Sequence, residues 1–248
     1  MDLVFCCVVG SILLLALVVR YIPQHWREGS TLKDSVEHFS ALNRTLFSFI
    51  LALSIVSAGT SLSKAADEVS AESASLTNLY WASRPLSDAT RDSVRRLTRQ
   101  YTATVIDKEW PAMAEGKAST QAQDQYDALR RVLQDASGGS EQEQTFTRDS
   151  LVALRAVGDA RRARMLAVSQ EIPNYLWIGL ILSAMFLVAA AAIQIPALTG
   201  PGVASIALLT LLVSAVLAVL AAMNHPFGGG VHVEPDAFKL ALQRFSVI

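Results

Sequence analysis

Charged residues are scarce in this 248-residue chain and are missing from long parts of it. They make up 17% of the sequence, whereas soluble proteins carry about 25%. Residues 3–19, 45–63 and 172–224 contain no Asp, Glu, Lys or Arg, and apolar residues make up 52% of the whole. The charge is therefore confined to the remaining segments, which excludes an ordinary soluble chain and a disordered one. We predict a membrane protein with a water-exposed insert.

A basic surplus is also lacking, because 21 Lys and Arg residues face 22 Asp and Glu residues. Binding to the phosphates of a nucleic acid needs such a surplus, so we expect no nucleic-acid partner. The two cysteines, Cys6 and Cys7, are adjacent within the first apolar window. Adjacent thiols there favour neither a disulfide framework nor a metal site, and we interpret them as apolar filler, with lipidation as the alternative.

The apolar windows predict membrane-spanning helices. A lipid core needs about 20 helical residues, and the first window is read as a retained helix because no Lys or Arg precedes it as in a signal peptide. The third window is too long for one helix and is interrupted by Pro196, Gly200, Pro201 and Gly202, which break helices. We therefore expect an all-α protein with four spans: residues 3–22, 46–62, 174–194 and 203–223.

Four spans place both termini and the insert between the second and third spans on one side of the membrane. Basic residues near the membrane are more frequent on that side, which favours the cytoplasm and a location in the cell membrane. The predicted parts are residues 1–63 (two transmembrane helices and their loop, 20–44), 64–171 (a cytosolic helical bundle), 172–224 (a transmembrane hairpin) and 225–248 (a cytosolic C-terminal tail).

The insert reads as helical throughout. The second span is predicted to continue as one long helix to Pro85, a second helix to run from Asp88 to a stop at Pro111, a third to begin at Ser119, and a fourth at Glu141. Each helix has one narrow apolar stripe, which is too little for a large independent core. We therefore expect a homo-oligomer in the lipid bilayer.

The predicted four-span topology does not bring possible catalytic residues together. His25 and His38 fall on one side of the membrane, and His225 and His232 on the other. No phosphate-binding loop, nucleophile elbow or metal-ligand spacing is present. The sequence therefore predicts no enzyme activity, no cofactor and no metal site, although a metal at His25 and His38 is the alternative to a solvated loop.

Hydroxyl groups recur along the second span, with Ser54, Ser57 and Ser61 on one side of it. Packing of small residues between helices explains this pattern, and so does a pore whose hydroxyls contact an ion beside an apolar constriction. The pore-lining candidates are Phe47, Ile50, Leu51, Ser54, Ser57, Ala58 and Ser61.

Basic residues Arg161, Arg162 and Arg164 precede the third span. They fit an anchor at the membrane interface or a vestibule that concentrates anions. Acidic residues at the inner end of the second span favour cations instead, so the sign of an ion stays open; they are Asp67, Glu68 and Glu72.

Several motifs resemble a bacterial family of bestrophin-like membrane proteins over residues 45–245. They are Glu109-Trp110-Pro111, the Arg161-Arg162 pair, and Pro226-Phe227-Gly228 after the fourth span. Bestrophins are homopentameric helical anion channels with four membrane helices per subunit, and their second span lines a narrow neck. The resemblance implies that fold and inorganic ions as partners. Eukaryotic members have an acidic calcium-binding cluster where this chain has residues 229–232, which hold no acid.

The same motifs have a purely structural interpretation. Trp110 and Pro111 can end a helix and fill the bundle core, and Pro226 and Gly228 can turn the chain so that three apolar residues of the tail, Phe238, Leu242 and Phe245, dock on the insert. Our leading hypothesis is an oligomeric ion channel, with anions favoured. The alternative is a sensory or scaffold protein whose helical bundle binds a ligand or partner without ion conduction.

Overall fold

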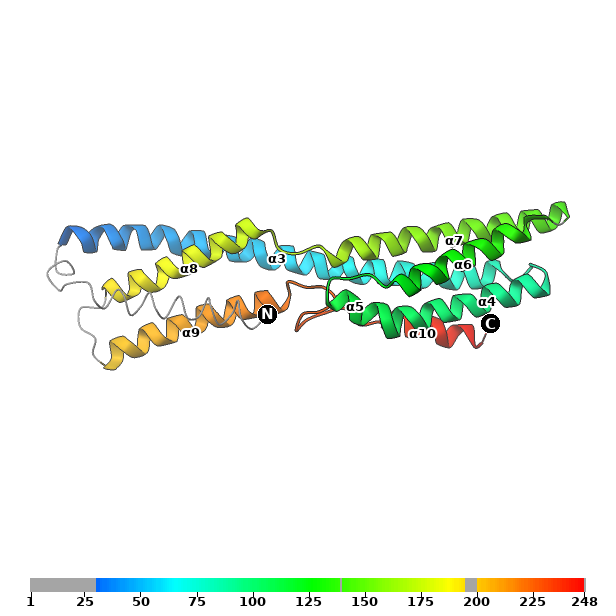
Figure 1. Ribbon diagram of the computed structural model, residues 1–248. Helices are drawn as coiled ribbons and strands as arrows, with labels where there is room; N and C mark the ends of the chain where they lie inside the picture. The colour runs from blue at the N-terminus through cyan, green and yellow to red at the C-terminus, as the bar shows by residue number, and fades with distance from the viewer. Residues whose placement is uncertain (1–29, 139, 195–199, 248) are drawn as a thin grey trace. The chain divides into compact units, whose positions relative to one another are not determined.

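The computed structural model describes residues 30–138, 140–194 and 200–247 (Figure 1). Within these ranges every regular element is helical, which confirms the all-α prediction. The elements are α3 (Ser30–Ala82), α4 (Asp88–Thr104), the π-helical turn η1 (Val105–Glu109), α5 (Trp110–Ala114), α6 (Thr120–Asp135), the 3-10 turn η2 (Ala136–Gly138), α7 (Glu141–Val168), α8 (Asn174–Gln194), α9 (Gly200–Ala222) and α10 (Asp236–Phe245).

The chain forms two compact units. The described residues up to 59 and from 172 to 224 make up one, here called the apolar unit, and those from 60 to 171 and from 225 onward make up the other, here called the bundle unit. The C-terminal segment therefore belongs to the same unit as the insert between α3 and α8.

Three helices in the described part of the chain are long and apolar enough to cross a membrane. They lie within Asp34–Ala82, Asn174–Gln194 and Gly200–Ala222. The structure thus shows three candidate spans where the sequence predicts four, because the first predicted span, residues 3–22, lies outside the described residues. In the apolar unit the three helices share a core made by Ala58 of α3 and by residues of α8 and α9: Leu180, Ala184, Val213, Leu217 and Leu220.

Helix α3 is longer than predicted. Residues 20–44 are predicted as a loop, but α3 already begins at Ser30. No proline occurs between Pro23 and Pro85, so nothing in the sequence removes a backbone hydrogen bond along it. Its 53 residues correspond to about 80 Å of helix, so a lipid core of about 30 Å covers less than half of it.

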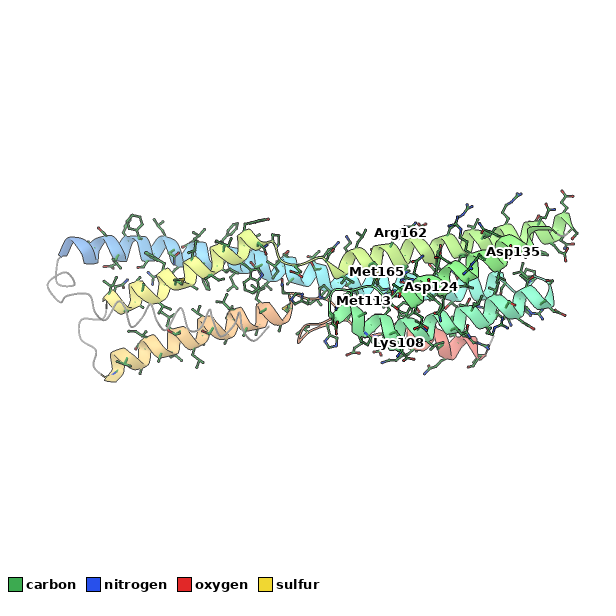
Figure 2. All side chains as sticks on the ribbon, in the orientation of Figure 1. Lys108, Met113, Asp124, Asp135, Arg162 and Met165 are labelled. Atoms are coloured by element: carbon green, nitrogen blue, oxygen red, sulfur yellow. The ribbon has the colours of Figure 1, made fainter. Side chains whose placement is uncertain are left out.

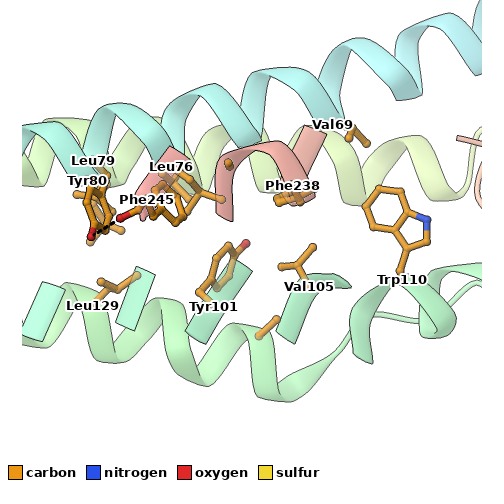
Figure 3. Packing of buried hydrophobic residues seen from close by; sticks show 14 of the residues in the cluster. Val69, Leu76, Leu79, Tyr80, Tyr101, Val105, Trp110, Leu129, Phe238 and Phe245 are labelled. Atoms are coloured by element: carbon orange, nitrogen blue, oxygen red, sulfur yellow. Dashed lines mark hydrogen bonds between the residues drawn. The ribbon is translucent and has the colours of Figure 1, made fainter. Parts of the chain in front are cut away.

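The bundle unit has a continuous core, seen closely in Figure 3. Val94, Tyr101 and Val105 are fully buried on α4 and η1, as the predicted stripe requires. From the C-terminal segment, Phe238 and Phe245 are buried in the same core, and Leu242 packs against it. The prediction that these residues dock on the insert is confirmed.

Short polar residues set the helix starts in the bundle unit. The side chain of Ser119 accepts a hydrogen bond from the backbone amide of Ala122 at the start of α6. At the start of α7, Ser140 and Glu143 form a reciprocal capping box. Both starts agree with the predicted ones, because an N-cap leaves a clear signature in the sequence.

Candidate functional site

One face of α3 is covered by α8 and α9 within the apolar unit. Ser54 and Ala58 are buried, and Phe47, Ile50 and Leu51 pack partly buried against the shared core. The hydroxyl of Ser54 donates to the backbone oxygen of Ile50 over 2.8 Å. This hydroxyl is therefore satisfied inside its own helix, as packing between helices requires. Of the remaining pore-lining candidates, Ser57 and Ser61 are partly exposed.

Polar side chains join α3 to α8 in the apolar unit. The amide nitrogen of Asn43 donates to the backbone oxygen of Ser183 over 2.9 Å, and the hydroxyl of Ser183 donates to the Asn43 side-chain oxygen over 2.7 Å. The amide of Gln194 donates to the hydroxyl of Ser40 over 3.1 Å. Such bonds between membrane helices fix how one helix is rotated against the other.

A second face of α3 carries large apolar side chains that stay exposed. The exposed fractions are 61% for Leu42, 52% for Leu46, 61% for Phe49 and 45% for Leu53. Spacings of four, three and four residues place them along one side of the helix. We call these four residues the exposed apolar face. It differs from the face that carries Ser54 and Ala58.

The bundle unit encloses a cluster of four charged side chains. The Nε and Nη2 atoms of Arg164 lie 2.6 Å from Glu72 Oε2 and 2.6 Å from Glu109 Oε2, respectively. The Nη2 atom of Arg161 lies 2.6 Å from the other oxygen of Glu109. Arg164 and both carboxylates are fully buried, and Arg161 is 6% exposed. Two positive and two negative charges balance, which buried charges require. We call these four residues the ion-pair cluster.

Neutral groups complete the surroundings of the ion-pair cluster. The Tyr101 hydroxyl donates to Glu72 Oε1 over 2.5 Å, and Arg164 donates to the sulfur of Met113 over 2.8 Å. The Arg164 guanidinium also lies 6.0 Å from the Trp110 ring centre and 5.5 Å from that of Phe238. These rings favour a buried cation.

The surroundings set the protonation of two members. Burial, and then the negative charge of Glu72, raise the pKa of the Tyr101 phenol well above its ordinary value of 10.0. Burial alone would lower the pKa of Arg164, but attraction and hydrogen bonding from Glu72 outweigh it and raise the pKa above the ordinary value. Tyr101 therefore stays a neutral donor and Arg164 a cation at neutral pH.

The π-helical turn η1 brings Glu109 and Trp110 into the core. The predicted stop at Pro111 is wrong, because the chain stays helical to Ala114 and Pro111 sits in the first turn of α5. Proline fits a first turn, where its missing amide hydrogen has no partner to lose. Because the π-helical turn η1 is wider than an α-helical turn, the chain passes from α4 into α5 without leaving a helical conformation.

The motif Pro226-Phe227-Gly228 packs on this helix restart. The rings of Phe227 and Trp110 meet edge to face at 5.5 Å. The Trp110 indole nitrogen donates to the backbone oxygen of Val233 over 3.3 Å. A Cβ atom on Gly228 would lie 2.6 Å from the backbone oxygen of Ala114, so only glycine fits this approach. A cavity of about 230 Å³ lies beside the motif, and its lining includes Glu115, Glu171 and His225.

The bundle core thus brings together most of the family motif residues and two of the three arginines for which the sequence suggested a role at the membrane interface or in a vestibule. Arg161 and Arg164 lie buried in the bundle core, and of the three only Arg162 is exposed, where it pairs with Asp159. Figure 2 shows Arg162 on the outer side of α7.

Sequence reasoning missed the pairing of Glu72 with Arg164. A signal did exist, because Glu72 interrupts the buried stripe of α3, and Arg161 and Arg164 interrupt that of α7. The α3 stripe consists of Ala65, Val69, Leu76 and Leu79, and the α7 stripe includes Leu154 and Val157. A charge within an apolar stripe indicates a buried partner.

Metal ligands do not converge in the described ranges, where no group of three or more His, Cys, Asp or Glu side chains could hold an ion. His225 lies 3.3 Å from Glu171 and His232 lies 3.1 Å from Glu234, both partly exposed. His25 and the cysteines lie outside the described residues.

Apolar helices of membrane-spanning length, joined to a helical bundle with a buried ion-pair cluster, define an α-helical membrane protein. The model of the bestrophin-like domain matches residues 5–238, and the chain belongs to this family. No curated protein and no solved structure matches the chain.

Proposed function

We propose that this protein assembles with copies of itself around a common axis and conducts inorganic ions, with anions favoured. The exposed apolar face of α3 carries this proposal. Its four large side chains lie on the one described helix whose span continues into the bundle unit, in a chain of the bestrophin-like family. The bestrophins that the sequence resembles are anion channels whose second span lines the pore.

An apolar face can serve an ion path by controlling water. Rings of large apolar side chains narrow a pore and exclude water until the pore widens, which gates conduction. Leu46, Phe49 and Leu53 supply such rings when copies of α3 surround an axis. The candidates Ser54 and Ala58 pack within the subunit, so we assign the narrowest part of the path to the exposed apolar face.

Single-channel recording of the purified oligomer in lipid bilayers tests this assignment. Phe49→Ala removes a large side chain from the proposed constriction and is expected to raise the unitary conductance. The matched control is Leu182→Ala on α8, where a similarly exposed side chain, at 62%, lies outside α3. It is expected to leave the conductance unchanged. Reversal potentials in asymmetric chloride give the sign of the ion.

Bilayers that stay silent with a well-folded oligomer would contradict conduction. That result would favour the alternative function, a membrane-anchored sensor or scaffold whose bundle unit binds a ligand or partner. Equal effects of Phe49→Ala and Leu182→Ala would contradict the assignment of the face. If Ser54→Leu changed the conductance of an intact oligomer, the path would instead follow the hydroxyl-bearing side of α3.

We place the protein in the cell membrane with the bundle of residues 64–171, the C-terminal tail and both termini in the cytoplasm. Three spans in the described ranges and the predicted span at residues 3–22 make an even number, which supports termini on one side. The division into residues 1–63, 64–171, 172–224 and 225–248 follows from this topology.

A further inference from the structure

Three segments of the bundle unit carry basic residues but no acidic ones. Residues 73–87 of α3 and its following turn, 93–106 of α4 and η1, and 237–247 of the C-terminal segment contain no Asp or Glu. They hold six basic residues, in a chain whose net charge is −1: Arg84, Arg95, Arg96, Arg99, Lys239 and Arg244. Lys239 pairs with Asp236. Among the described residues, no ion pair involves the five arginines.

Two of these arginines converge on the ring of Tyr80. The Arg95 guanidinium carbon lies 4.6 Å from the ring centre, and that of Arg99 lies 5.3 Å from it. Phe245 stacks on the same ring at 4.6 Å between centres. Both guanidinium groups thus contact the ring of the same tyrosine, although like charges repel.

The hydrogen bonds of Arg99 leave its charge uncompensated. Arg99 donates to the Tyr80 hydroxyl, and to the backbone oxygen of Phe245 over 2.8 Å. Both acceptors are neutral. The Nε atom of Arg95 is buried and has no partner within the described structure. The protein itself therefore does not satisfy the Arg95 guanidinium, and its partly exposed remainder keeps donors for an anion.

We propose that Arg95 and Arg99 form the centre of a binding site for a phosphate group. Their positions four residues apart on α4 place them on one side of the helix, so neighbouring oxygens of one tetrahedral phosphate can accept from both. Guanidinium groups bind phosphate through paired hydrogen bonds, and the stack on Tyr80 fixes the orientation of both groups in advance. Arg96 and Arg244 add to the positive potential around the site. The site is independent of ion conduction.

Calorimetry on the full chain in phosphatidylcholine nanodiscs tests this site, with inorganic pyrophosphate as the probe. Saturable binding is expected, and Arg95→Ala is expected to weaken it by about tenfold or more. Arg99→Ala is expected to act similarly, and a thermal melt reports whether the C-terminal helix stays docked in that variant. Arg95→Lys keeps the charge but loses the paired geometry, so intermediate weakening is expected.

Arg162→Ala is the matched control, because it removes one exposed positive charge from α7, away from the stack on Tyr80. It is expected to leave pyrophosphate binding unchanged. A second titration uses dihexanoyl phosphatidate. Tighter binding of this lipid analogue than of pyrophosphate, with the same loss in Arg95→Ala, supports the site with a lipid head group as its natural source. Tighter pyrophosphate binding supports a soluble phosphate compound.

Two outcomes would overturn the site. One is the lack of saturable binding of either probe at concentrations up to roughly 1 mM. The other is equal weakening by Arg162→Ala and Arg95→Ala, which would show attraction by net charge alone.

Discussion

At the residue scale, the ion-pair cluster is the feature whose loss we expect to cost most. In Glu72→Gln, Arg164 keeps only Glu109 as a carboxylate partner in a fully buried setting. Removing one partner of a buried pair costs about 3–5 kcal/mol. We therefore expect a large fall in the free energy of unfolding, measured by denaturant titration in detergent.

Asp159→Asn is the control for this experiment, because its pair with Arg162 is largely exposed at both side chains. Exposed pairs contribute less than about 1 kcal/mol. Adding Arg164→Gln to Glu72→Gln restores charge balance and should recover part of the loss. A Glu72→Gln protein as stable as Asp159→Asn would show that the cluster does not stabilise the fold.

Tyr101 should make the bundle unit sensitive to alkali. Its pKa in the folded protein is raised above 10.0 by burial and by Glu72, so above that pH the unfolded chain releases a proton that the folded chain keeps. The free energy of unfolding is therefore unaffected below about pH 10 and falls above it, by at most about 1.4 kcal/mol per pH unit for one group.

Denaturation midpoints between pH 8 and pH 11 measure this effect. Tyr101→Phe should be less stable at pH 8, since Glu72 loses a donor, but should show a shallower fall above pH 10. Tyr175→Phe, which removes a phenol that is 71% exposed, should keep the wild-type slope. A wild-type slope in Tyr101→Phe would assign the alkaline loss to other groups.

At the element scale, the contact between the C-terminal end of α5 and the loop after α9 depends on one glycine. Gly228→Ala places a Cβ atom 2.6 Å from the backbone oxygen of Ala114, and overpacking of this kind costs about 1–3 kcal/mol. Thermal melting of the variant should show a lower midpoint. Gly138→Ala, where nothing lies within 4 Å, should melt close to wild type, and equal midpoints for the two would contradict this close approach.

Helix ends in the bundle unit could be predicted because short signals mark them. Ser140 with Glu143 marks the start of α7, and Pro85 follows the end of α3 closely. The restart at Pro111 could not be predicted, since residue periodicity does not distinguish an α-helical turn from the π-helical one before it. The charges that interrupt the stripes of α3 and α7 indicated buried partners for Glu72 and Arg164, but 92 residues separate the two, so only the packing of the helices shows that they pair.

The same contrast applies to α3 in the apolar unit. The hydroxyls of Ser54 and Ser57 set one side of the second span apart from the rest of the helix. Small residues of this kind occur both where helices pack together and where a helix lines a pore, so the sequence did not distinguish the two. Burial of Ser54 and Ala58 against α8 and α9 distinguishes the covered face from the exposed apolar face. This distinction needs the neighbouring helices, which a single helical pattern does not contain.

At the scale of the whole molecule, the proposed topology has a direct test. Single cysteines at Lys117 in the bundle unit and at Val247 near the C-terminus, in a chain with Cys6 and Cys7 replaced by serine, should be labelled from the same side of the membrane. Both sites are well exposed, Val247 at 87%. A membrane-impermeant maleimide should react with both in inverted vesicles and with neither in intact cells. Labelling from opposite sides would mean an odd number of spans between them and exclude a shared cytoplasmic location.

The complete burial of Glu72, Glu109 and Arg164 also shields them from dissolved ions. At physiological ionic strength charges are screened over about 8 Å of solvent, but counter-ions cannot enter a dry interior. Added sodium chloride should thus weaken attraction at solvent-facing arginines such as Arg96 and Arg99, and leave the interior charges almost untouched. A salt series would thereby separate the electrostatics of the protein's surface from those of its core.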